Sequence, residues 1–229
     1  TKEFSVRALQ RKTVVIYNSI DTSEISSERG LSGLNYLQKL SHETKRIGIF
    51  SRIEPWKGQE IAIDAMEKLV KHRKDVKLFV FGEPYTSKGK AYFDRIKKKV
   101  VEKGLENFVE FPGSIKFVNK VYSEFDIVLL TSVDPEPFGR VTVEGMAAGR
   151  PVIATNIGGS KEIITNWKDG VLVEPGNPKQ LADAILELLK NSSLRHEIEK
   201  AAMQRAKDFD AKKITLEVEN LYENLMSGS

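Results

Sequence analysis

Two glutamates, eight residues apart, carry the clearest chemical signal in the sequence. Glu136 and Glu144 lie in the segment TSVDPEPFGRVTVEG, whose prolines and glycine exclude Glu136 from a helix. We expect Glu136 on a loop, and Glu144 about one turn into a helix that begins at Arg140. Ionised carboxylates accept hydrogen bonds from hydroxyl groups, so the pair is suited to a polyhydroxy ligand such as a sugar. The alternative is purely structural, with Glu144 on a helix surface and Glu136 as a cap.

The same segment contains a candidate anion site. At the start of the expected helix, the amides of Gly139, Arg140 and Val141 have no partner within the helix, and the helix dipole places partial positive charge there. Such a terminus attracts phosphate groups. The backbone from Phe138 to Val141 is therefore suited to a diphosphate beside the two carboxylates.

A second polar loop, SRIEPWKG, follows the expected strand that ends near Phe50. Its Arg52 and Lys57 are cations suited to phosphate, and Gly58 lets the backbone approach a ligand. Basic residues in loops are usually only solvated. The loop is therefore a candidate for phosphate binding only if the fold brings it close to Glu136 and Glu144.

Alternating strands and helices are expected to position both loops. Short β-branched or aromatic runs alternate with segments whose apolar residues recur every three or four positions. This alternation predicts an α/β fold with a Rossmann-like, doubly wound parallel sheet. Ligands bind such sheets beyond the carboxyl ends of the strands. The expected strands are 46–50, 76–81, 108–111, 127–131, 151–155 and 171–173, and the expected helical stripes are 61–70, 181–189, 198–206 and 214–225.

Composition excludes several classes of protein. The chain has no cysteine, and its 36 basic and 32 acidic residues leave a net charge of +4. Lysine-rich runs at 71–74 and 97–99 lack interleaved aromatic residues, so we interpret them as solvated helix faces and expect no nucleic-acid partner. Asp208 and Asp210 have the spacing of a metal-binding pair, but a divalent cation needs further oxygen ligands, so we expect no metal.

Neither a membrane-spanning run nor a signal-peptide pattern is found in the sequence. We therefore predict a cytoplasmic location, and leave open a peripheral membrane contact of the full-length protein.

In type and order, these motifs resemble glycosyltransferase family 4, whose members are retaining enzymes with the GT-B fold. The run from Glu136 to Glu144 is similar to the family's motif of two glutamates separated by seven residues, and Arg52 with Lys57 and Gly58 is similar to its phosphate loop. Further similarity is found in the segments FPGSI, GRPVIA and GGSKE. The similarity covers about residues 13–190, and it implies the C-terminal, nucleotide-sugar-binding half of such an enzyme.

The resemblance implies catalytic roles for three residues. Arg52 and Lys57 would neutralise the donor diphosphate as it leaves, a task that other transferases give to a metal. Glu136 would bind hydroxyls of the donor sugar. The implied donor is a UDP-, GDP- or ADP-sugar with no other cofactor, and the sugar is transferred to an acceptor hydroxyl with retention of anomeric configuration.

The resemblance also implies a donor-binding set. Glu144 would bind the ribose hydroxyls, and Ile115 would present main-chain groups to the base, with Lys116 or Lys120 nearby. Sugar and phosphate oxygens would be held by the backbone of Phe138, Gly139, Arg140 and Val141. Two loops depart from the family pattern: GEP at 82–84 is one residue shorter than usual, and GGSKE lacks a proline. The base preference and the sugar-side contacts therefore do not follow from the resemblance.

On this basis we divide the chain into three parts. We expect residues 1–12 to be a residual segment of a missing N-terminal part, and 13–210 to form the donor-binding, Rossmann-like domain. Residues 211–226 form a helix that either completes this domain's core or packs on the missing half. Residues 14–17 are expected to be a strand, whereas 26–41 are either a helix or a loop.

The chain alone is expected to bind donor with little or no turnover, because a two-domain cleft needs both walls. The acceptor, a saccharide or a lipid, is not identified.

Other functions are compatible with the same fold. A nucleotide-sugar epimerase or a phosphorylase would share the sheet, although a phosphorylase needs a lysine-bound pyridoxal phosphate. A non-catalytic nucleotide-sugar-binding module would keep the sheet without activity, but the joint presence of both cations and both glutamates argues against such decay. A dinucleotide-binding dehydrogenase is disfavoured because no strand is followed by GxGxxG.

Overall fold

A parallel sheet places both polar loops along one edge. The computed structural model describes residues 13–25, 27–28, 34, 37, 40–41, 43–116 and 118–227, and its centre is a six-stranded sheet in the order β3-β2-β1-β4-β5-β6. All neighbouring strands are parallel, so their carboxyl ends lie at the same edge. The chain reverses its direction of strand addition between β1 and β4, which is where doubly wound sheets bind ligands. The predicted fold class is confirmed. The strands are β1 (Lys45–Phe50), β2 (Val76–Phe81), β3 (Val109–Gly113), β4 (Ile127–Leu130), β5 (Val152–Thr155) and β6 (Val171–Val173).

The strands form because their side chains are apolar on both faces. In β4, Ile127 and Leu129 join one hydrophobic cluster, whereas Val128 and Leu130 join the cluster on the opposite face. This alternation is the two-residue period of an extended chain. The predicted strands agree with the observed ones to within two residues at each end.

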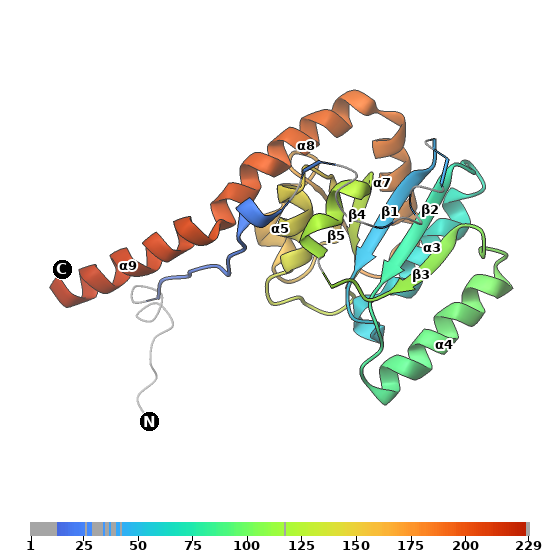
Figure 1. Cartoon of the computed structure of the whole chain (residues 1–229), viewed down its shortest axis with the longest axis horizontal. Coiled ribbons are helices and arrows are strands. Elements are labelled where there is room, and N and C mark those ends of the chain that lie inside the picture. Colours follow the sequence, from blue (N-terminus) through green and yellow to red (C-terminus); the bar gives the residue numbers. More distant parts are fainter. Residues whose placement is uncertain are drawn as a thin grey trace.

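Helices cover both faces of the sheet (Figure 1). The first cluster contains the apolar faces of α3 (Gln59–Leu69), α4 (Ser87–Glu102) and α7 (Pro178–Lys190). The second contains residues of α5 (Arg140–Ala147) and α6 (Ser160–Ile163). Helix α8 (Ser192–Ala206) contributes to both clusters, through Ile198 to the first and through Ala202 and Ala206 to the second.

The last helix, α9 (Ala211–Ser227), extends away from the body of the molecule (Figure 1). Of its residues only Ile214 is buried. The N-terminal segment 13–25 crosses the base of this helix, where the Ile20 amide donates to the Phe209 carbonyl at 3.0 Å and the Ala211 amide donates to the Ile20 carbonyl at 2.9 Å. No described helix is both long and apolar enough to cross a membrane.

The strand predicted at 14–17 is wrong. Residues 13–19 have no regular structure, and the segment makes only an isolated bridge between Ile20 and Asp210. Val14 and Val15 are 62% and 68% exposed, so their β-branched side chains are not packed in a sheet. A strand is stable only when a neighbour pairs with its backbone, and the local apolar pattern could not reveal that lack. Residues 1–12 and most of 26–41 lie outside the described residues.

Candidate functional site

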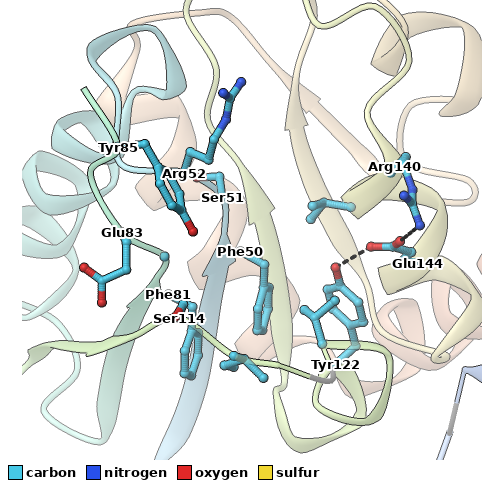
Figure 2. A pocket seen from close by; sticks show the side chains of 14 residues that line it. Phe50, Ser51, Arg52, Phe81, Glu83, Tyr85, Ser114, Tyr122, Arg140 and Glu144 are labelled. Atoms are coloured by element: carbon cyan, nitrogen blue, oxygen red, sulfur yellow. Dashed lines mark hydrogen bonds and ion pairs between the residues drawn. The ribbon is translucent and has the colours of Figure 1, made fainter. Parts of the chain in front are cut away.

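A cavity of about 530 Å³ opens at the carboxyl ends of β1 and β2, beside the start of α5 (Figure 2). Its position is the switch point of the sheet, where loops from both halves diverge. The floor is largely aromatic, and charged side chains stand at the walls. The lining residues are Phe50, Ser51, Arg52, Phe81, Gly82, Glu83, Tyr85, Ser114, Ile115, Val118, Tyr122, Arg140, Val141 and Glu144.

Arg52 stands at the rim of this cavity, on the loop that follows β1. Its side chain is exposed and extends away from the aromatic floor in Figure 2. The backbone beneath it is fixed by Gln59, a fully buried residue at the start of α3 whose Nε2 donates to the Arg52 carbonyl at 2.8 Å and to Ser51 Oγ at 3.0 Å. The Arg52 side chain therefore projects from a stretch of backbone that Gln59 holds in place.

Gly58 allows the same loop to pack closely against the end of β4. Its φ of 64° is in the left-handed region, and a Cβ there would lie 2.1 Å from the Thr131 carbonyl oxygen. Two hydrogen bonds complete the junction, one from the Val133 amide to the Trp56 carbonyl at 2.8 Å, the other from Thr131 Oγ1 to the Lys57 carbonyl at 3.0 Å. The close approach explains why glycine occupies this position.

Lys57 and Glu136 form an ion pair with each other, and neither lines the cavity. The Lys57 ammonium also lies over the Trp56 ring, 4.0 Å from its centre, and Ser132 Oγ donates to Glu136 Oε1 at 2.6 Å. The roles that the family resemblance implies would require both cations to face one pocket, with both carboxylates at its rim. In the structure Arg52 and Glu144 line that pocket, whereas the charge of Lys57 is neutralised by Glu136, because the two loops pack together at this junction.

The start of α5 is held by the glycine-rich loop that precedes α6. Gly139 caps the helix with a φ of 87°, and no side chain caps its first turn. A Cβ on Gly159 would lie 2.4 Å from the Phe138 carbonyl oxygen, and the Gly159 amide donates to the Glu136 carbonyl at 2.8 Å. The Phe138 side chain is buried in the second cluster. The loop from Glu136 to Gly139 is thus anchored on both sides, and the first turn of α5 contributes Arg140 and Val141 to the cavity lining.

Glu144 is 7% exposed, and each of its carboxylate oxygens has a partner (Figure 2). Tyr122 donates to Oε2 at 2.6 Å, and Arg140 Nη2 donates to Oε1 at 3.0 Å. Burial, and then the charge of Glu144, raises the pKa of Tyr122 well above its usual value, so the phenol remains the donor. Sequence reasoning missed Tyr122, since it lies 22 residues from Glu144 and no local signal marks it.

The wall opposite Glu144 is formed by the segments that leave β2 and β3. Ile115 lines the cavity as expected for a residue beside a base, together with Glu83 from the shortened GEP loop and Tyr85. Lys116 and Lys120 are exposed and do not line it. The polar side chains at this end of the cavity are therefore those of Glu83, Tyr85 and Ser114, rather than a lysine.

Asp208 and Asp210 each pair with other side chains of the chain. Asp208 pairs with Arg205 at 3.0 Å and with Lys213 at 2.7 Å, and Asp210 accepts from Thr22 Oγ1 at 2.5 Å. Within the described part of the chain, no three His, Asp or Glu residues gather closely enough to hold a metal ion. This Asp-x-Asp segment ties α9 to α8 and to the N-terminal segment.

Comparison with known proteins finds relatives that are named as glycosyltransferases. An uncharacterised glycosyltransferase of Methanocaldococcus jannaschii is 30% identical over 220 residues, which are 95% of this chain and 55% of that protein. A phosphatidyl-myo-inositol mannosyltransferase of Mycobacterium leprae is 26% identical over 100% of this chain and 58% of its own length. Among solved structures, Anabaena HepE in complex with UDP-glucose is 30% identical with a TM-score of 0.85, covering 93% of this chain and 57% of HepE.

The chain thus spans 55% to 58% of the length of these relatives. Its α/β fold with a six-stranded parallel sheet matches the structures of GT-B glycosyltransferases. The profile of the family described as Glycosyl transferases group 1 matches residues 37–205, which is more than half of the chain. By this match, and by the relatives that share its motifs and its sheet, the chain belongs to the family of group 1 glycosyl transferases.

Proposed function

We propose that the chain binds the nucleoside diphosphate sugar used by a retaining transferase of glycosyltransferase family 4. One observation carries the proposal: a single cavity at the switch point is lined by Arg52, Glu144 and the first turn of α5. The cation and the helix N-terminus suit a diphosphate, and the carboxylate suits ribose hydroxyls. Similarity to HepE, whose structure was solved in complex with UDP-glucose, supports this class of ligand.

The Lys57–Glu136 pair is proposed to exchange partners when the donor binds. The diphosphate would attract the Lys57 ammonium, and the released Glu136 carboxylate would accept hydrogen bonds from the donor sugar. As the sugar leaves, negative charge grows on the diphosphate, and Arg52, Lys57 and the α5 N-terminus would stabilise it. The resemblance to family 4 implies that the departing phosphate assists the acceptor on the same face of the sugar, which retains the configuration.

Transfer itself is proposed for a longer protein. The relatives are nearly twice as long as the matched segment, and we propose that a further domain supplies the acceptor-binding wall. The exposed apolar residues of α9, Leu216, Tyr222, Leu225 and Met226, would pack on that domain. The chain alone would then bind donor with little turnover, because water still reaches the reacting centre.

Calorimetry with UDP, GDP and ADP tests donor binding directly. One of these nucleotides should bind with a Kd of about 1 mM or tighter, and Arg52→Ala should weaken that binding about tenfold, because it removes a charge-assisted contact to phosphate. Arg95→Ala is the matched control, since Arg95 is an exposed cation of α4 outside the cavity. Heat from none of the three, or an equal loss in both variants, would count against the proposal.

A further inference from the structure

A buried tyrosine holds the carboxylate that lines the cavity. The Tyr122 hydroxyl has no solvent exposure and lies 2.6 Å from Glu144 Oε2. Such a short contact between a neutral O–H and a carboxylate is among the stronger hydrogen bonds in proteins. Because the phenol is neutral, it orients Glu144 and leaves the negative charge available to a ligand.

The position of this hydroxyl is fixed by the packing of its ring. Tyr122 begins the 3-10 turn Tyr122–Glu124 (η4), and its ring meets the Phe50 ring edge-on at 4.7 Å between centres. Phe50 in turn stacks on Phe81 at 5.0 Å and meets Phe125 edge-on at 5.2 Å. The rings of Phe50, Phe81 and Tyr122 also line the cavity, so the group that orients Glu144 belongs to its floor.

The two partners of Glu144 differ in their freedom to move. The Arg140 side chain is 70% exposed, so its contact with Oε1 is made at the surface and is readily exchanged. The Tyr122 contact with Oε2 is buried, so water does not readily replace the phenol. An ionised carboxylate has about four lone-pair positions, so two remain when both partners are bound. These are enough for the two O–H groups of a vicinal diol.

We propose that Tyr122 is a positioning residue that orients Glu144 for the ribose diol of the donor nucleotide. The inference rests on the proposed function, and adds to it the residue that sets the geometry of ribose recognition. Tyr122 touches no reacting atom. Its effect should therefore appear in the discrimination between a ribonucleotide and an analogue that lacks the diol.

The test compares two ligands on matched variants of the 229-residue chain. The ligands are whichever of UDP, GDP or ADP binds the wild-type chain and its 2′,3′-dideoxy form. Tyr122→Phe should weaken the ribonucleotide about tenfold, as loss of one hydrogen bond to a charged group does, and should leave the dideoxy analogue within about twofold. Tyr92→Phe is the control, since it removes another buried tyrosine hydroxyl, which accepts from the Glu60 amide at 3.0 Å and lies outside the cavity.

Each other result is decisive. If Tyr122→Phe weakens both ligands equally, or neither, the positioning role is wrong while the donor site stands; if no nucleotide binds the wild-type chain, the proposed function itself fails. Should Tyr122→Phe unfold the chain, Arg140→Ala decides. An equal loss of affinity for both ligands, with the discrimination between them retained, would support the proposal. A loss of that discrimination would assign the orientation of Glu144 to Arg140 and overturn the proposal.

Discussion

The ammonium of Lys57 is paired with the carboxylate of Glu136 at a junction where the side chains are only 13% and 9% exposed. Lys57 belongs to the loop after β1 and Glu136 to the loop after β4, 79 positions later. The pair therefore joins the two segments whose residue types suggested chemistry. Because both charges are largely desolvated, each depends on the other for compensation.

Breaking this pair should destabilise the chain more than replacing it. Glu136→Gln is expected to lower the free energy of unfolding by about 3 kcal/mol, because it leaves the Lys57 charge buried without a counter-charge. The double variant Lys57→Met with Glu136→Leu should lose only about 1 kcal/mol, since apolar side chains of similar volume can replace a buried pair. Urea unfolding of both variants measures the difference. Equal losses would show that the pair is effectively solvated.

The same pair should compete with phosphate for Lys57. Glu136→Gln releases the ammonium, so we expect the variant to bind the nucleoside diphosphate without its sugar about threefold more tightly, whereas Lys57→Met should weaken it about tenfold. Glu110→Gln removes a carboxylate that pairs with Lys77 on the outer part of the sheet and makes the same change in net charge. Titration calorimetry of the three variants separates the local effect from the general one. Tighter binding by Glu110→Gln as well would assign the gain to net charge.

Gly58 should not tolerate a side chain, and Gly104 is the control that separates close packing from backbone strain. Gly58 and Gly104 have nearly the same φ, 64° and 62°, but a Cβ meets the Thr131 oxygen at 2.1 Å in the first and nothing within 4 Å in the second. Gly104→Ala should cost about 1 kcal/mol, the strain of a left-handed residue alone. Gly58→Ala should cost at least about 3 kcal/mol and weaken nucleotide binding, because the loop must move away from β4. Thermal unfolding of both variants checks this, and similar losses would contradict the close packing.

Acid should loosen the contact between the N-terminal segment and α9. The hydrogen bond from Thr22 holds the pKa of Asp210 below its ordinary value of 3.8. A lowered pKa in the folded state stabilises the fold above pH 3.8, and that contribution is lost as the pH falls through the folded value. Asp210→Asn should therefore show a smaller loss of stability between pH 5 and pH 2 than the wild-type chain, measured by denaturant unfolding. Asp183→Asn, on the surface of α7, is the control; an unchanged pH dependence in Asp210→Asn would exclude the contact as its source.

The sequence by itself determined the sheet and the loops that matter. The strands are predictable because each is a compact apolar run whose pattern is local, and the helix from Arg140 is predictable because Pro137 and Gly139 exclude it earlier. The same local logic placed Arg52 on the loop after β1 and Glu144 one turn into the helix from Arg140, whereas the role of Ile115 was implied only by the family resemblance. It failed at 14–17, because a β-branched run becomes a strand only where a neighbouring backbone is available, and Val14 and Val15 have none in the described structure.

Only the tertiary structure decided which polar side chains are in contact with each other. Lys57 and Glu136 lie 79 residues apart, and Tyr122 and Glu144 lie 22 apart, so no spacing rule relates either pair. Their contacts depend on how β1 and β4 lie next to each other in the sheet, and on how tightly Gly58 lets the loop after β1 approach the end of β4. The residue types indicated a phosphate- and hydroxyl-binding site, whereas packing assigned Glu136 to a lysine and Glu144 to a buried phenol, because desolvated charges require a partner within hydrogen-bonding distance.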